Sequence, residues 1–291
     1  MRLTIEFGFT PTRRLRRPLL PFAVLAATTA SAMTWLEVDK LLPSDGHEHA
    51  FFGHTVAIDD NTAIVATPFD AGAGEVGDFR GAAYVFARDN LGNWDAQAKL
   101  LPAFSGFAHQ FGYSVDIDGS TVIAGMFEED LNPTEDAAYI FVRDASGNWR
   151  EEAALTASDG IFGDGFSVSV AVDGDTAFVG TRPETLTGFV DLTGAVYVFN
   201  RDASGTWSEQ AKLVASDSAI GDTFGRTLDL DGDTAIISRA RDDDDGTGTV
   251  IVSAYIFTRD ALGTWSEHTK LSTSRADSLR GRIRASTSGC Y

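Results

Sequence analysis

The residues most suited to chemistry are acidic, and they gather in short stretches between apolar segments. The densest stretch is Asp242, Asp243, Asp244 and Asp245, which Gly246 follows. Carboxylate oxygens are the ligands that Ca²⁺ prefers, so Asp242 and Asp244 are candidate metal ligands. The same pattern is also typical of a solvated loop whose charges repel one another, and the sequence favours this second interpretation.

Further acidic residues lie in other polar segments between the apolar stretches of the chain. With the Asp242–Asp245 run, they make up the predicted ligand-binding face: Glu128, Glu129, Asp130, Asp70, Glu75, Asp78, Glu184 and Asp191. If the fold brings these segments together, the resulting field attracts a cation or a basic partner. His47, His49 and His54 are a weaker metal candidate, because no cysteine or further ligand stands at a supporting spacing.

No catalytic signature is present, and we assign no catalytic residue. The chain has no G-x-S-x-G, no H-E-x-x-H and no phosphate-binding loop. Carboxylate pairs on separate loops would nevertheless suit a glycoside hydrolase or lyase that acts on polysaccharide. This enzyme remains an alternative to a binding protein.

The acidic stretches are spaced by a repeat that tryptophan marks. Trp35, Trp94, Trp149, Trp207 and Trp265 are separated by 59, 55, 58 and 58 residues, and they are all the tryptophans of the chain. Each begins a related segment, such as WDAQAKL or WSEQAKL, in which Leu follows Trp by six residues. Strand periodicity predicts that this Trp and Leu share one face. Self-similarity at this period indicates a propeller or solenoid.

Each unit contains three more short strands. The first follows Phe and usually Gly, at Phe52-Gly53, Phe111-Gly112, Phe166 and Phe224-Gly225. A tight turn leads to an apolar second strand such as TAIVA, which we expect to be covered on both faces. A longer loop precedes the third strand, such as AAYVFARD, and a turn in which glycine takes positive φ leads to the next Trp. We therefore interpret Tyr84, Tyr139, Tyr197 and Tyr255, which recur in the third strand, as packing residues.

These observations predict an all-β protein, a β-propeller with four-stranded antiparallel blades. The predicted propeller covers residues 33–272, with complete blades at about 51–101, 110–156, 165–214 and 223–272 and an extra outer strand at 35–41. Four complete blades fit either a closed four-bladed ring or a partial, truncated propeller. The acidic loops lie on the end of the blades opposite to the tight hairpins, where binding sites are usually built.

The combination of Phe-Gly, SVAVD, D-G-D-T, GAVYVF and W-x-x-x-x-K-L over residues 35–272 resembles the FG-GAP repeat of integrin α-chains and secreted bacterial proteins. The resemblance implies a propeller fold and an extracellular interaction role. Ser167 and Ala154 depart from the repeat, where glycine and lysine are usual. The calcium loop of integrin-type blades is shortened here to a hairpin, so no cofactor is required and Ca²⁺ lacks a complete motif.

The N-terminus resembles a secretory signal peptide over residues 1–32. Four arginines precede an apolar run that ends in Ala30-Ser31-Ala32, which predicts cleavage after Ala32. We expect a secreted, periplasmic or cell-surface protein without an integral membrane segment after cleavage. The remaining chain has 18 basic and 41 acidic residues, a net charge of −23, which disfavours nucleic acid as a partner.

The C-terminal segment 273–291 departs from the repeat, because it carries four arginines and the single cysteine, Cys290. We expect a degenerate or disordered tail, or a shifted reading frame. The sequence as a whole favours a secreted binding or adhesion module for an extracellular protein or glycan. A hydrolase or lyase, and a purely structural or non-functional fragment, are the alternatives.

Overall fold

The computed structural model describes residues 37, 39–46, 50–71, 80–103, 109–127, 136–160, 165–181, 193–219, 221–242 and 250–272. The predicted signal peptide and C-terminal tail lie outside these ranges. Of the predicted extra strand at 35–41, Glu37 and residues 39–41 are described, and none of them is in a strand. The described residues form strands, turns and loops but no helix, and so none that is long and apolar enough to cross a membrane.

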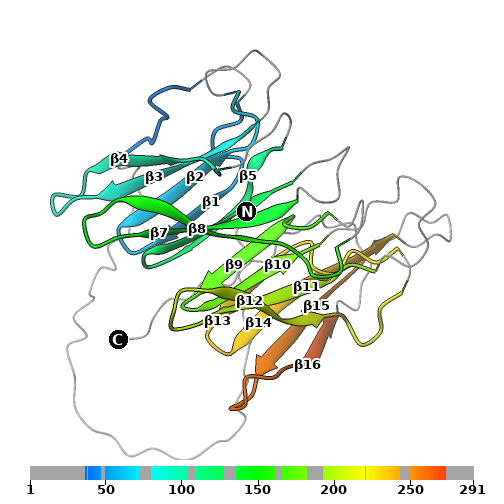
Figure 1. Cartoon of the computed structure of the whole chain (residues 1–291). Helices are drawn as coiled ribbons and strands as arrows, with labels where there is room; N and C mark the ends of the chain where they lie inside the picture. Colours follow the sequence, from blue (N-terminus) through cyan, green and yellow to red (C-terminus); the bar gives the residue numbers. More distant parts are fainter. Residues whose placement is uncertain are drawn as a thin grey trace, which may run out of the picture. The chain divides into compact units, whose positions relative to one another are not determined.

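Sixteen strands form four antiparallel sheets, and in each sheet the strands lie side by side in chain order (Figure 1). Sheet 1 contains β1 (Val56–Asp59), β2 (Thr62–Thr67), β3 (Ala82–Arg88) and β4 (Trp94–Leu100). Sheet 2 contains β5 (Phe111–Asp118), β6 (Thr121–Met126), β7 (Ala137–Arg143) and β8 (Trp149–Leu155).

Sheet 3 contains β9 (Ser169–Asp173), β10 (Thr176–Gly180), β11 (Val196–Arg201) and β12 (Trp207–Leu213). Sheet 4 contains β13 (Leu228–Asp231), β14 (Thr234–Asp242), β15 (Val250–Arg259) and β16 (Trp265–Ser272). Four four-stranded antiparallel sheets confirm the predicted all-β fold with propeller blades. The second strand is buried along its whole length in sheets 1, 2 and 3, as predicted.

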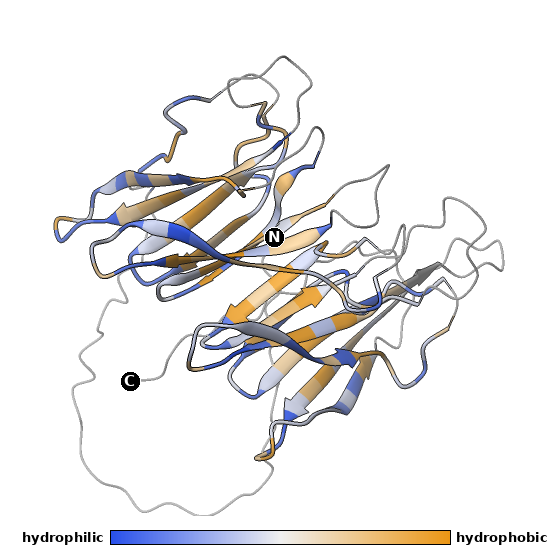
Figure 2. Cartoon of the chain, in the orientation of Figure 1, coloured by the Kyte–Doolittle hydropathy of each residue, from blue (hydrophilic) through white to orange (hydrophobic). Residues whose placement is uncertain are grey.

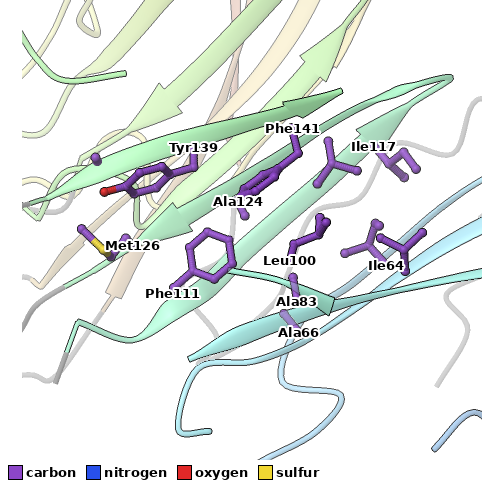
Figure 3. Packing of buried hydrophobic residues seen from close by; sticks show 13 residues of the cluster. Ile64, Ala66, Ala83, Leu100, Phe111, Ile117, Ala124, Met126, Tyr139 and Phe141 are labelled. Atoms are coloured by element: carbon purple, nitrogen blue, oxygen red, sulfur yellow. The ribbon is translucent and has the colours of Figure 1, made fainter. Parts of the chain in front are cut away.

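The core consists of apolar layers between consecutive sheets. Figure 2 shows that the central strands are the most hydrophobic and that the outer strands carry more hydrophilic residues. Between sheets 1 and 2, Ile64 and Leu100 face Phe111 and Phe141 (Figure 3). Equivalent layers lie between sheets 2 and 3 and between sheets 3 and 4. We call the face of a sheet that packs on the next sheet its leading face, and the opposite face its trailing face.

Each recurring tyrosine lies beside the phenylalanine that begins its unit: Tyr139, Tyr197 and Tyr255 lie in these layers, and Tyr84 lies in a smaller cluster on the trailing face of sheet 1. Phe111 and Tyr139, for example, pack edge to face with ring centroids 5.9 Å apart. All four tyrosines are buried: Tyr84, Tyr139, Tyr197 and Tyr255. Their predicted role in packing is therefore confirmed.

The predicted common face for Trp and Leu in the last strand of each unit is wrong. The pairing of the third and fourth strands shifts register once in every sheet, as between Val85 and Phe86 in sheet 1. Such a bulge adds one residue to the strand and reverses the side-chain alternation beyond it. Trp94 consequently packs on the trailing face of sheet 1, whereas Leu100 packs on its leading face.

Turns at one end of each sheet are short and alike. Where the third strand ends, Asp144 accepts hydrogen bonds from the N–H groups of Ser146 and Asn148 at 2.8 and 2.9 Å. Gly147 in this turn has φ 87°, and the equivalent glycines of the other sheets also have positive φ. We call this the hairpin end. The opposite end, which we call the loop end, carries the longer loops and the connections between sheets.

Candidate functional site

The acidic residues selected from the sequence for a ligand-binding face belong to the segments between the second and third strands of the sheets. Most of them lie outside the described residues: Glu75, Asp78, Glu128, Glu129, Asp130, Glu184, Asp191, Asp243, Asp244 and Asp245. Asp242 ends strand β14, and its side chain lies outside the description. Of the histidine candidates, His47 and His49 lie outside the described residues, whereas His54 is described. Among the described residues, no group of three or more potential metal ligands occurs.

Asp70 is the one selected acid whose side chain the structure places, and it is buried in an ion pair. Its Oδ2 lies 2.7 Å from Lys99 Nζ and accepts a hydrogen bond from the Tyr84 hydroxyl at 3.1 Å. Asp45 binds the same two partners, Tyr84 at 2.6 Å and Lys99 at 2.7 Å. Asp70 thus supports the base of the loop that follows β2. It presents no exposed carboxylate to a ligand.

This arrangement recurs in other sheets and explains the lysine of the W-x-x-x-x-K-L segment. In sheet 3, Asp159 accepts hydrogen bonds from Tyr197 and Lys212 at 2.5 and 2.8 Å. In sheet 4, Asp217 does the same with Tyr255 and Lys270 at 2.6 and 2.5 Å. Each aspartate lies in the connection that enters the sheet, so the cluster fixes that connection to the last two strands. Sheet 2, whose sequence has Ala154 in place of the lysine, lacks this ion pair.

The electrostatics of these clusters stabilise the charged forms of their members. Hydrogen bonds from Lys270 and Tyr255 lower the pKa of Asp217 to about 2. Burial opposes the charge on Lys99, but its hydrogen bonds to Asp45 and Asp70 outweigh burial and raise its pKa. A group held so firmly in one charge state at neutral pH is a poor proton donor or acceptor. The clusters are therefore suited to positioning loops.

Sheet 4 adds a buried cation to its cluster. Arg239 replaces the threonine that stands at this position in sheets 1 and 3, and its Nη1 lies 2.9 Å from Asp217 and 3.5 Å from Asp222. Arg239 and Asp222 are both buried. This pairing offsets the cost of burying each charge, and it attaches the connection between sheets 3 and 4 to strand β14.

A row of aromatic side chains also lies at the loop end, on sheets 1 and 2. The ring of Phe51 packs against Phe69 with centroids 5.2 Å apart, and His54 lies 6.3 Å from Phe69. His54 in turn lies 5.3 Å from Tyr113, which packs on Phe127 at 4.8 Å. Phe127 is buried, His54, Phe69 and Tyr113 are partly buried, and Phe51 is 62% exposed. We call these five residues the aromatic row.

Phe51 is held in an unfavourable backbone conformation. Its φ of 56° lies in the left-handed region, which bulky side chains avoid. Gly165, which precedes Phe166 as Phe51 precedes Phe52, has φ 59° and meets the same requirement without strain. Neither burial nor backbone preference accounts for a phenylalanine here. A strained, exposed aromatic residue is a candidate for direct contact with a ligand.

The repeat of the sequence does not reveal the aromatic row, because these five residues do not recur from unit to unit. Where Tyr113 stands in sheet 2, sheets 3 and 4 have Val168 and Arg226. The available signal was the residue before the unit's first phenylalanine, which is Phe51, Gln110, Gly165 or Thr223. An apolar aromatic at that variable loop position stands out once the units are aligned.

A carboxyl with an unusual pKa lies on strand β5. Burial raises the pKa of Asp116 to about 7, and the nearby charges of Asp229 and Asp118 act in the same direction. Asp116 accepts a hydrogen bond from the N–H of Val172 at 2.8 Å, which links sheet 2 to sheet 3. This contact assigns Asp116 a structural position between sheets.

Comparison with known proteins connects the repeat to a family. The sequence pattern described as the FG-GAP repeat matches the chain four times, over residues 35–86, 94–141, 149–199 and 207–257. No curated protein matches the sequence.

Similar solved structures include a GH32 β-fructofuranosidase from Bombyx mori, at 11% identity and a TM-score of 0.39 over 72% of this chain and 47% of the enzyme. The chain thus spans about half the length of that protein. A periplasmic gluconolactonase from Pseudomonas aeruginosa has 13% identity and a TM-score of 0.33, covering 77% of this chain and 86% of the other. A protein from Lactobacillus plantarum has 16% identity and a TM-score of 0.36, with 76% and 71% covered.

Proposed function

The chain belongs to the FG-GAP repeat family, and from that premise we propose that it is an exported binding module without catalytic activity. Its partner is an extracellular glycan or protein, which it contacts at the loop end of the sheets. The aromatic row supplies the contact surface, and the acidic residues of the segments between the second and third strands select neutral or basic partners. No cofactor takes part.

The observation that carries this proposal is Phe51. Its ring is exposed, its backbone is strained, and Phe69, His54 and Tyr113 extend it into a continuous aromatic surface. Aromatic residues dominate the energetic centres of binding surfaces, because they bury a large apolar area at a small cost in side-chain entropy. Flat aromatic rings also suit the C–H faces of sugar rings.

The recurring Asp–Tyr–Lys clusters supply rigidity at the same end. By fixing the connections to the strands, they leave fewer degrees of freedom to be lost when a partner binds. Variable loops on such a base are the usual location of binding sites. The net charge of −23 after the predicted cleavage would repel anionic glycans, so neutral and amino-sugar glycans are the expected class.

The first test is a glycan array probed with the labelled chain and with Phe51→Gly. We expect binding to neutral or amino-sugar glycans, and its loss in Phe51→Gly. Glycine suits φ 56°, so the variant should melt at or slightly above the temperature of the wild type. The matched control is Leu91→Ser at the hairpin end, since Leu91 is 87% exposed and serine is the natural residue at this position in sheets 2 and 3. Unchanged glycan binding by Phe51→Gly would refute the assignment of the aromatic row.

The acidic loops are tested separately by charge removal. Changing Asp243, Asp244 and Asp245 to asparagine should weaken binding of an amino-sugar glycan and should affect a neutral glycan less. A control with the same change in charge at the hairpin end, Asp60, Asp95 and Asp175 to asparagine, should leave both unchanged. Release of shortened products from any array glycan would identify a hydrolase or lyase instead.

A further inference from the structure

Sheet 4 exposes apolar residues that the other sheets bury on their leading faces. Leu271 is 51% exposed, whereas its equivalents in sheets 1 to 3 are 3–5% exposed: Leu100, Leu155 and Leu213. Ile236 and Ile256 of sheet 4 are half-buried, while the residues at their positions in the other sheets are fully buried. The next sheet along the chain provides that cover in sheets 1 to 3.

Sheet 1 exposes apolar residues on its trailing face, the face that the preceding sheet covers in sheets 2 to 4. Ile58 is 66% exposed, whereas its equivalents are 4–8% exposed because the preceding sheet covers them: Ile117, Val172 and Leu230. Val56, on the same face, is also exposed. The chain therefore presents a leading face at sheet 4 and a trailing face at sheet 1, the two halves of the interface that it forms three times internally.

Two hydrogen bonds recur in each internal interface. The turn glycine of one sheet donates its N–H to the aspartate that ends the first strand of the preceding sheet, as from Gly119 to Asp59 at 2.7 Å. The same bond links Gly174 to Asp118 and Gly232 to Asp173, both at 2.8 Å. On sheet 4 the equivalent acceptor is Asp231, which is exposed and receives no hydrogen bond from the part of the chain that the structure describes.

The second recurring bond starts from a hydroxyl on the first strand. Thr55 donates to the carbonyl of Gly112 at 3.0 Å, and Ser169 donates to that of Gly225 at 2.6 Å. Sheet 4 has Thr227 at this position. Its hydroxyl bonds instead to Ser238 of its own sheet at 2.8 Å. Sheet 4 thus keeps both polar groups that the internal interfaces use.

We propose that this face of sheet 4 binds a second copy of the chain, head to tail, through the trailing face of that copy's sheet 1. Sheet 1 carries what the interface requires. Phe52 packs edge to face on Tyr84 and Phe86, as Phe111 does on Tyr139 and Phe141. Gly53 supplies the carbonyl for Thr227, and the backbone N–H of Asp60 stands at the position of the donor for Asp231.

Part of the trailing face of sheet 1 is already covered, since Leu41 packs against the cluster that contains Tyr84 and Phe86. Ile58 and Val56 remain exposed beside it. The second copy therefore seats on this exposed part. The contact is heterologous, so two copies close into a ring if the rotation permits, and otherwise the assembly continues to grow.

One residue makes this interface weaker than the internal ones. Ser238 stands where sheets 2 and 3 have Gly125 and Gly180, and a Cβ on Gly125 would lie 2.4 Å from the carbonyl oxygen of Ser167 in the next sheet. Sheet 1 has Ala66 at this position, packed close to Gly112. A serine is bulkier than either, and its hydroxyl also competes for Thr227. Association should therefore be reversible and depend on concentration.

Sedimentation velocity of the full chain over a wide concentration range tests the proposal. We expect the mean mass to rise with concentration for the wild type, and Ile58→Asp and Leu271→Asp each to remain monomeric. Both residues are exposed, so the variants should fold, which circular dichroism will verify. Val56→Lys provides a second variant of the trailing face. Leu91→Asp, at the hairpin end, is the control that should associate like the wild type.

Mixing the two variants distinguishes a head-to-tail contact from a symmetric one. Ile58→Asp keeps an intact sheet 4 and Leu271→Asp keeps an intact sheet 1, so an equimolar mixture should form a one-to-one complex that grows no further. Ser238→Ala, which restores the residue of sheet 1, should tighten the association roughly fivefold. A wild type that stays monomeric at every concentration would overturn the proposal. So would association of Ile58→Asp alone, or a mixture that forms no complex.

Discussion

Asp116 offers the clearest link between one side chain and the stability of the stack of sheets. Burial raises the pKa of this carboxyl to about 7, whereas the pKa of a free aspartate is about 3.9. At a pH between these two pKa values, Asp116 keeps its proton in the folded chain and has lost it in the unfolded chain. The free energy of unfolding therefore falls as the pH rises from about 4 to about 7. Asp116→Asn removes this dependence and keeps an oxygen to accept the hydrogen bond from Val172.

The size of the effect follows from the difference in pKa. About three pKa units correspond to ~4 kcal/mol, which is an upper bound. Asp116 keeps some contact with solvent, and water reduces the energetic cost of its charge, so we expect a difference of ~2–4 kcal/mol. At pH 8 the asparagine variant should therefore be more stable than the wild type by about this amount, and near pH 4 the two should be alike.

Urea unfolding followed by tryptophan fluorescence, at closely spaced pH values, measures this difference. Comparing wild type with variant cancels the titration of all other groups, provided that the dependence of the free energy on urea is the same. If the free energies of unfolding of the wild type and of Asp116→Asn differ by a constant amount across this pH range, the assigned pKa is refuted. It would also show that Asp116 keeps its charge between sheets 2 and 3.

Three further predictions concern other parts of the fold. Because the pKa of Asp217 is lowered, this carboxylate contributes stability that is present above about pH 4 and is lost as the pH falls toward about 2. Asp217→Asn should therefore lower the free energy of unfolding by ~1 kcal/mol at pH 7, a value that allows for the 46% exposure of the side chain, and should not change it near pH 2. Gly81→Ala should destabilise the chain by at least ~2 kcal/mol in urea unfolding, because φ is 77° and a Cβ would lie 2.1 Å from the carbonyl oxygen of Phe111. Gly92→Ala is the control and should cost only ~1 kcal/mol, because a Cβ on Gly92 would have no atom within 4 Å. Millimolar Ca²⁺ should leave the melting temperature unchanged in differential scanning calorimetry, and a rise would reveal a native calcium site in the acidic loops.

The repeat made most of the fold predictable from the sequence. Spaced tryptophans, Phe-Gly pairs and turn glycines each mark a fixed place in one sheet, and together they predict all-β blades. The faces of Trp94 and Leu100 were not predictable, because the bulge that separates them comes from the pairing of two strands and leaves no mark in either segment. Pairing is a tertiary property, and strand periodicity alone assumes that it is regular.

The candidate site was less accessible to sequence reasoning. Asp70 had the residue type of a ligand-binding acid, but its burial depends on Lys99, which belongs to another strand of the sheet. The aromatic row joins two sheets, so no local pattern contains it. Aligned units single out Phe51 as an unusual residue at its position, but its positive φ and its exposure come only from the structure.

Amide hydrogen exchange of the free and glycan-bound chain measures whether the sheets are a scaffold and whether binding occurs at their loop end. We expect a glycan identified on the array to slow exchange around residues 50–54 and 110–113, which contain Phe51, His54 and Tyr113. Exchange in the turns 89–93 and 144–148 at the hairpin end should not change. Slower exchange at those turns, with none at residues 50–54, would contradict binding at the loop end.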